Sequence, residues 1–257
     1  MPLIKVDFFS EVLSLSTSVT VLLPKQPFEE GKKRANNKFP TLFLLHGFSD
    51  DHSAWTRMTS IERYVEQQGL AVVMPQVDHS FYTDMVYGKK YWTFLTEELP
   101  FIMRSMFPLS DKREDNFVAG LSMGGYGAFK WALSHPEQFA AAASLSGAVD
   151  IVDRVKNGDS QTFRNIFGEE DLKGTADDLF YLIEQGNQSN NEKPLLFQCC
   201  GTEDFLYEDN VRFYEFCKKT SYPLTTEFDK GTHEWGYWDQ KIQQVLAWLP
   251  LHEKKNN

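Results

Sequence analysis

Short apolar runs recur along the chain, separated by longer stretches in which apolar residues follow a helical spacing. Runs that are apolar at every position are typical of parallel strands buried on both faces. Together with less apolar segments of strand-like composition, they predict strands at residues 41–45, 70–74, 116–121, 139–145, 195–200 and 224–228. The stretches between them predict helices at residues 53–68, 91–107, 123–134, 208–220 and 235–248. This alternation predicts an α/β fold with a mainly parallel, doubly wound sheet and helices on both faces.

The pattern is weaker toward the two ends of the chain. Residues 4–10 alternate between apolar and polar side chains and predict an edge strand. Residues 12–23 predict a second strand that is broken near residues 16–17. The charged stretch 25–39 predicts an exposed loop, and the tail 253–257 predicts a frayed end.

A chain of 257 residues suits one large α/β domain or two small ones. No linker rich in proline and serine divides it, and no internal repeat is visible, so we expect a single domain over residues 1–257. Residues 150–193 are less regular than the rest. We expect short helical pieces there, forming a cap-like insertion. In the predicted helix 91–107, Pro100 predicts a kink.

Charge and cysteine content narrow the class of protein. The net charge of −10 argues against binding to nucleic acids or to anionic membranes, both of which attract basic patches. The first residues have no apolar core of signal-peptide length, and no apolar run approaches the ~18 residues of a membrane span, so we expect neither a signal peptide nor a membrane span. Cys199, Cys200 and Cys217 are predicted to be buried free thiols, which fits a reducing compartment. We therefore expect a soluble cytoplasmic protein.

The segment Gly120-Leu121-Ser122-Met123-Gly124 lies between a predicted strand and a predicted helix. A G-x-S-x-G motif in that setting is the nucleophile elbow of serine hydrolases, in which a strained turn presents the serine hydroxyl. It makes Ser122 the candidate nucleophile and aims the backbone N–H of Met123 into the same space. Taken alone, the motif fits a turn of small residues equally well.

A serine nucleophile needs a base and an acid that orients the base. His233 follows the last predicted strand, and Asp204 follows the strand before it. Glu203 and Asp209 are neighbouring acids that could substitute for Asp204. The order Ser122, Asp204, His233 is that of the α/β-hydrolases.

The other five of the six histidines have weaker claims. We expect His46 to brace the loop that contains it, whereas His52 and His79 could line a site. His135 ends a predicted helix, and His252 lies in the tail.

The loop His46-Gly47-Phe48 follows an early buried strand, where this kind of fold places a second oxyanion donor. The backbone N–H groups of Phe48 and Met123 are therefore the candidate oxyanion hole. The aromatic side chains of Trp55, Tyr82 and Trp235 are candidates for contacting a substrate. For Trp55 and Tyr82, packing beneath the loops is an equally good interpretation, and packing is favoured for Trp238.

No metal or cofactor motif competes with the serine centre. His233-Glu234 begins like a zinc-binding H-E-x-x-H motif, but Tyr237 stands where the second histidine is required. Neither a phosphate-binding P-loop nor the dinucleotide-binding glycine spacing is present. We therefore expect no metal and no cofactor.

The chain resembles the esterase D group of α/β-hydrolases, close to bacterial tributyrin esterases and acetyl esterases. The resemblance runs along nearly the whole chain and is strongest at residues 46–50, 80–84, 120–127 and 233–238. It implies a serine carboxylesterase that hydrolyses short-chain acyl esters, from acetyl to butyryl, including O-acetylated sugars in some members. It also suggests a homo-oligomer. The alternatives are an S-formylglutathione hydrolase, a feruloyl-type esterase, an acyltransferase and, outside the enzymes, a binding module on a hydrolase fold.

Overall fold

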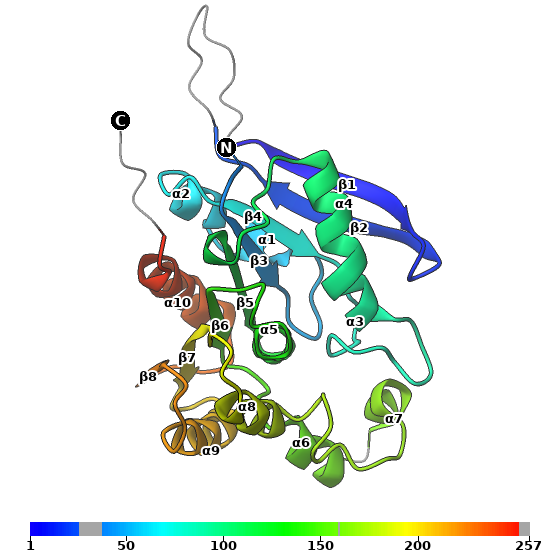
Figure 1. Ribbon diagram of the computed structural model, residues 1–257, viewed down its shortest axis with the longest axis vertical. Coiled ribbons are helices and arrows are strands. Elements are labelled where there is room, and N and C mark those ends of the chain that lie inside the picture. Colours follow the sequence, from blue (N-terminus) through cyan, green and yellow to red (C-terminus); the bar gives the residue numbers. More distant parts are fainter. Residues whose placement is uncertain (26–37, 159, 252–257) are drawn as a thin grey trace, which may run out of the picture.

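The computed structural model describes residues 1–25, 38–158 and 160–251 (Figure 1). Most of the loop expected at residues 25–39 lies outside the described residues, as do His252 and the tail expected to fray. None of the described helices is long and apolar enough to cross a membrane.

One eight-stranded sheet organises the described chain, with the strand order β1-β2-β4-β3-β5-β6-β7-β8. The strands are β1 (Leu3–Ser10), β2 (Leu15–Leu22), β3 (Thr41–Leu45), β4 (Ala71–Pro75), β5 (Asn116–Leu121), β6 (Ala141–Leu145), β7 (Leu195–Gly201) and β8 (Leu224–Asp229). β1 pairs antiparallel with β2, and β2 with β4, whereas all other pairs are parallel. The prediction of a mainly parallel sheet is confirmed.

Helices cover both faces of the sheet, as the alternating pattern predicts. Successive strand residues point to opposite faces, so Leu42 and Leu44 join one buried cluster and Phe43 joins the other. The cluster with Phe43 includes side chains of α4 (Leu99–Met106), α5 (Met123–Ser134), α8 (Leu179–Gln188) and α9 (Tyr207–Cys217). The opposite cluster includes side chains of α1 (Ala54–Met58), α2 (Ile61–Val65) and α10 (Trp235–Trp248).

The second strand differs from its prediction. No break occurs at Ser16 and Thr17, because these residues pair with Phe9 and Phe8 of β1. The interruption lies earlier, in the turn at residues 11–14 that connects the two strands. β1 is the edge strand that its pattern predicts.

One predicted helix is divided, and a second is continuous but contains a π-helical turn. The helix expected at 53–68 is split because Thr59 has an extended backbone, with its hydroxyl donating to Trp55 O and accepting from Ile61 N–H. Such side-chain bonds compete with the helical backbone pattern. The helix expected at 91–107 comprises α3 (Tyr91–Thr93), a π-helical turn (Phe94–Glu98) and α4.

The region 150–193 lies between β6 and β7. It contains α6 (Ile151–Asn157), α7 (Gln161–Phe167) and α8. A short 3-10 turn (Arg113–Asp115) precedes β5. Since β5, β7 and β8 run parallel, their carboxyl ends lie at one edge of the sheet, which is where the candidate site forms.

Candidate active site

Ser122 lies between β5 and α5 with φ 53° and ψ −117°, a conformation that is strained for any residue with a side chain. Two glycines make this turn sterically possible. A Cβ at Gly120 would lie 2.3 Å from the Gly124 carbonyl oxygen, and one at Gly124 would lie 2.5 Å from the Leu45 carbonyl oxygen. The close contacts involve backbone, so no side chain fits at either position.

Ser122, His233 and Asp204 form a continuous hydrogen-bonded chain. The Ser122 hydroxyl lies 3.0 Å from His233 Nε2, and His233 Nδ1 lies 2.8 Å from Asp204 Oδ2. Because an ionised carboxylate only accepts, Nδ1 carries the proton and Nε2 is left to accept from the serine. The three residues follow β5, β8 and β7, so the sheet brings together side chains that are far apart in sequence.

Asp204 is suited to remain ionised in this position. Its side chain is 0% exposed, and its second carboxylate oxygen accepts from Leu206 N–H at 2.8 Å. Burial is the largest influence and raises the pKa of Asp204, but hydrogen bonds from His233 and Leu206 outweigh it, so the net pKa is lowered. The two alternative acids are placed elsewhere: Asp209 binds Arg212 at 2.8 Å, and Glu203 is exposed.

The loop after β3 packs directly against the elbow. A Cβ at Gly47 would lie 2.6 Å from Leu121 Cδ1 and 3.8 Å from Ser122 Cβ. Within the described part of the chain, neither Phe48 N–H nor Met123 N–H donates a hydrogen bond to another protein atom. Both N–H groups are therefore free of protein acceptors in the described structure.

Residues 10–249 match the family model described as "Putative esterase". The chain belongs to this esterase family. An acetyl esterase of Caldicellulosiruptor saccharolyticus is 29% identical, with 97% of this chain and 98% of the relative covered.

Two solved Staphylococcus aureus structures are also similar, each at 36% identity. The fluorophosphonate-binding serine hydrolase FphF has a TM-score of 0.90, covering 98% of this chain and 99% of that one. The S-formylglutathione hydrolase FrmB has a TM-score of 0.87, covering 96% and 98%. The protein is a serine carboxylesterase with an α/β-hydrolase fold.

Two of the predicted substrate contacts of the esterase are wrong. Trp55 and Tyr82 are fully buried, so neither side chain can touch a substrate. Trp55 Nε1 donates to Leu45 O at 3.0 Å, and the Tyr82 hydroxyl donates to His46 O at 2.9 Å. These two side chains therefore support the end of β3 and the loop that leads to Phe48.

The third predicted contact, Trp235, is half-buried. Its ring centroid lies 5.2 Å from that of Trp55 and 5.4 Å from that of Trp238. Trp238 is buried, as expected, but its ring also meets the edge of His233, with centroids 4.8 Å apart. Of the three predicted contacts, Trp235 alone retains exposed surface in the described structure.

His46 braces the loop of the esterase, as expected. Its Nδ1 donates to Gly47 O at 2.7 Å, and its Nε2 accepts from Val77 N–H at 3.2 Å. Burial lowers the pKa of His46 to about 4, so the ring stays neutral near neutral pH.

The other described histidines divide as follows. His79 is exposed and stacks on the Phe48 ring with centroids 4.3 Å apart, so it borders the site. His52 instead shares a hydrogen bond with Thr20 of β2. His135 is the C-cap of α5, the helix-end role that its position predicts.

Sequence reasoning missed Phe205, which borders the His233 ring. The two ring centroids are 4.5 Å apart, and Phe205 is 66% exposed. The guanidinium of Arg154, on α6, lies 5.4 Å from the Phe205 ring centre. The available signal was its position, since Phe205 directly follows the acid of the site.

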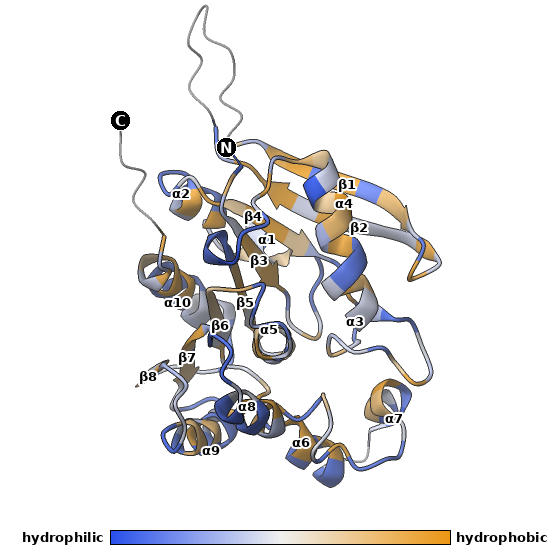
Figure 2. Ribbon diagram, in the orientation of Figure 1, coloured by the Kyte–Doolittle hydropathy of each residue, from blue (hydrophilic) through white to orange (hydrophobic). Residues whose placement is uncertain are grey.

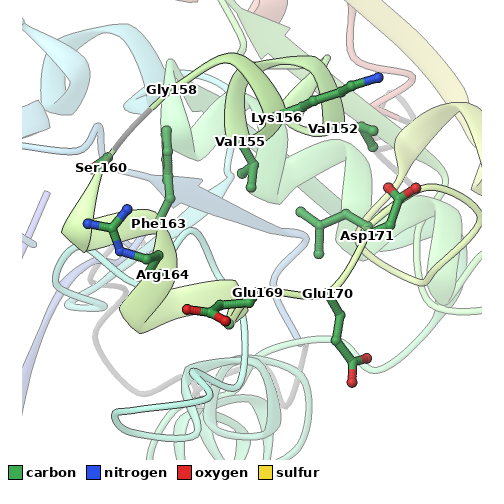
Figure 3. Close-up of a pocket in the computed structure, with 12 residues that line it drawn as sticks. Val152, Val155, Lys156, Gly158, Ser160, Phe163, Arg164, Glu169, Glu170 and Asp171 are labelled. Carbon is green, nitrogen blue, oxygen red and sulfur yellow. The ribbon is translucent and has the colours of Figure 1, made fainter.

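A pocket of about 340 Å³ lies between α6, α7 and the following loop (Figure 3). Val152, Val155 and Phe163 line it together with charged side chains, whereas the triad residues do not. Phe163 also meets Phe81 at 5.4 Å between centroids, and Phe81 meets Phe48 at 5.7 Å. Aromatic contacts thus connect this pocket of the esterase to the loop beside Ser122. Among the described residues, no cluster of three or more His, Cys, Asp or Glu side chains could hold a metal ion.

Proposed function

We propose that Ser122 is the nucleophile of this carboxylesterase, with His233 as its base and Asp204 as the orienting acid. The observation that carries the proposal is the hydrogen-bonded chain Ser122–His233–Asp204 on a strained strand-to-helix turn. As the Ser122 oxygen attacks the ester carbonyl, His233 Nε2 takes the hydroxyl proton. Asp204 holds the productive tautomer and stabilises the imidazolium that forms.

The backbone N–H groups of Phe48 and Met123 are the proposed oxyanion donors. They would stabilise the negative oxygen of the tetrahedral intermediate, and a single such donor typically lowers the barrier by ~3 kcal/mol. His233 then returns its proton to the departing alcohol, leaving an acyl-enzyme on Ser122. Water activated by His233 releases the acid and restores the serine. Activity is expected to fall when acid protonates His233.

We propose short acyl esters, from acetyl to butyryl, as the substrate class, with O-acetylated sugars among them. The similarity to an acetyl esterase over nearly the full length of both chains supports this class. The Phe48 ring, which packs on Phe81 with centroids 5.7 Å apart, is an apolar surface next to the loop and is the proposed contact of the acyl group. The two other open aromatic surfaces, Phe205 and Trp235, are available to the alcohol portion.

S-formylglutathione hydrolase is the second candidate, because a solved enzyme with that activity is 36% identical to this chain. The same nucleophile, base and oxyanion donors would serve a thioester. Comparison of kcat/KM for S-formylglutathione with kcat/KM for a series of p-nitrophenyl and sugar acetates separates the two. A preference for the thioester of more than about a hundredfold would replace the first proposal with the second.

Labelling with a fluorophosphonate tests the nucleophile directly. Wild type should label at Ser122, and Ser122→Ala should lose both labelling and turnover, the latter by roughly 10⁴-fold or more. The matched control is Ser134→Ala, at the other end of α5, which should label normally. Equal labelling of the Ser122→Ala variant would assign the nucleophile elsewhere.

Three further expectations belong to this proposal. We propose that residues 150–193 act as a cap beside the site, since Arg154 contacts Phe205 and Phe163 contacts Phe81. A cytoplasmic location is supported by three buried free cysteines. Assembly into a homo-oligomer is expected from the family resemblance.

A further inference from the structure

Among the described residues, the backbone groups along the outer edge of β1 have no pairing strand. β1 is the last strand of the sheet, and its only partner in the described structure is β2 (Figure 1). Edge strands of this kind are templates for pairing with another strand, and proteins usually blunt them.

The pairing with β2 determines which residues face outward. Leu23 N–H donates to Pro2 O at 3.1 Å, and the register continues without a bulge over the whole of β1. Antiparallel pairs alternate between bonded and non-bonded positions. The even residues of β1 therefore bond to β2, and the backbone groups of Leu3, Lys5, Asp7 and Phe9 point away from the sheet.

The outward-facing sequence is complementary to itself in one register. If two copies of β1 pair antiparallel around a two-fold axis at Val6, Lys5 of each copy lies opposite Asp7 of the other, and Leu3 lies opposite Phe9. A shift by two residues places Lys5 opposite Lys5, or Asp7 opposite Asp7. Opposite charges stabilise such cross-strand pairs and like charges destabilise them, so one register is selected.

Exposed apolar side chains accompany this edge. Leu3 is 45% exposed and Phe9 is 56% exposed, and on α4 Phe101 and Met106 are exposed as well. Figure 2 shows hydrophobic and hydrophilic positions along β1 and on α4, which lies over the end of the sheet formed by β1 and β2. A two-fold axis perpendicular to the sheet places both copies of α4 on the same face. By contrast, no residue of β8, at the opposite edge, is among the exposed large apolar side chains.

We propose that the chain forms a two-fold homodimer in which β1 pairs with β1 of a second copy, with Lys5 of each copy opposite Asp7 of the other. The dimer joins the two sheets into one. This interface does not depend on the proposed catalytic roles, because the triad follows β5, β7 and β8.

Charge reversal tests the interface and its register together. Wild type should sediment at twice the monomer mass of 29.7 kDa over a dilution series. Lys5→Asp creates two acidic pairs across the axis and Asp7→Lys creates two basic pairs, so each variant alone should raise the Kd at least about tenfold. Esterase activity per chain should remain unchanged in both variants, which shows that they are folded.

Mixing the two variants provides the rescue. A heterodimer of Lys5→Asp with Asp7→Lys restores both attractive pairs, so the mixture should regain dimer mass. The proposal is overturned by a monomeric wild type, by single variants that remain dimeric, or by a mixture that stays monomeric.

A cross-link provides an independent measurement of the register. Val6 lies on the two-fold axis at a non-bonded position, where opposing Cα atoms are ~4.5 Å apart, within disulfide range. Val6→Cys should therefore cross-link two chains under mild oxidation, whereas Ile4→Cys should not. Equal cross-linking of both variants would contradict the register. The native cysteines are buried and should not contribute.

Discussion

Ser122 and the region 150–193 follow neighbouring strands of the sheet, but they are held in different ways. Around Ser122 the close contacts are made by backbone: Gly120 packs on Gly124, and Gly124 packs on the carbonyls of Leu45 and His46. Those two carbonyls in turn accept from buried side chains. A site built this way keeps its geometry but tolerates almost no change.

Residues 150–193 are held by buried apolar side chains such as Ile166 and Ile183 and, in addition, by polar side chains that reach the neighbouring helices. Asp177 accepts from Lys130 of α5 at 2.6 Å, and Asp150 accepts from Arg212 of α9 at 2.9 Å. Two pockets, of about 340 and 480 Å³, are both lined by side chains of α6. The space beside α6 leaves room for side chains of other sizes. We infer that backbone contacts around Ser122 maintain the geometry needed for the reaction, whereas side chains of residues 150–193 can be replaced and influence which substrate is preferred.

The same substitution in both regions should have the most unequal effect. Gly124→Ala places a Cβ 2.5 Å from Leu45 O and 2.7 Å from His46 O, so we expect a loss of more than about 3 kcal/mol in unfolding free energy, with no measurable turnover. Gly174→Ala meets no atom within 4 Å, and its φ of +74° costs only about 1 kcal/mol. Urea unfolding and measurement of kcat for both variants test this difference. Similar losses of stability and activity in the two variants would contradict it.

The two ion pairs that connect residues 150–193 to α5 and α9 should also differ in how much they contribute to stability. The Lys130 amine is buried and binds Tyr82 O, Thr83 Oγ1 and Asp177, so Lys130→Met should cost about 3 kcal/mol by leaving these partners unpaired. Arg212 is half-exposed, and solvent screens its ion pairs, so Arg212→Met should cost no more than about 1 kcal/mol. Chemical unfolding of both variants measures the two losses of unfolding free energy. Equal losses would contradict the prediction that Lys130→Met is the more destabilising change.

Local signals in the sequence were sufficient to locate the parallel strands and the three residues that the structure joins by hydrogen bonds, Ser122, His233 and Asp204. Apolar runs and glycines mark β3 to β7, and the elbow, Asp204 and His233 each directly follow a strand. The same kind of signal could not assign Trp55 and Tyr82. Their burial depends on contacts between distant segments: a Cβ at Gly127 of α5 would lie 2.4 Å from the Tyr82 ring, so only a glycine there admits the phenol.

The division of the helix predicted at 53–68 and the π-helical turn in the helix predicted at 91–107 were missed for a related reason. Thr59 ends α1 through two side-chain hydrogen bonds that a hydrophobic pattern does not register. The helical backbone is continuous from Tyr91 to Met106, and the π-helical turn Phe94–Glu98 ends two residues before Pro100. Inside a helix a proline removes one backbone hydrogen bond, and the irregular turn lies where that bond is lost.

The stability of the loop beside Ser122 should respond to pH through His46. The folded state holds the pKa of His46 at about 4, below its ordinary value of ~6.5 in an unfolded chain. Between these values the unfolded chain binds the extra proton, so stability falls as pH falls. From about pH 7 to about pH 5 this effect should be about 2 kcal/mol.

The measurement is urea unfolding of wild type and His46→Gln at both pH values. The variant should be less stable than wild type at neutral pH, because it loses the bonds to Gly47 and Val77. It should also lose about 2 kcal/mol less than wild type on acidification. The same pH slope in both proteins would show that another group is responsible.

The smallest expected effect comes from removing one buried phenol hydroxyl in each region. Because the chemical change is the same, any difference in activity reflects the region and not the substitution. Tyr82 donates to His46 O and Tyr126 donates to Asp177 O, both at 2.9 Å, so either Tyr→Phe change leaves a carbonyl without its donor and should cost about 1–2 kcal/mol. Only Tyr82 supports the loop that aims Phe48 N–H. Tyr82→Phe should therefore lower kcat by about tenfold with little change in KM, and Tyr126→Phe should leave kcat within about twofold of wild type. An equal fall in kcat for both variants would mean that the loop beside Ser122 and residues 150–193 act as one unit. The proposed difference between the rigid site around Ser122 and the more variable region 150–193 would then be wrong.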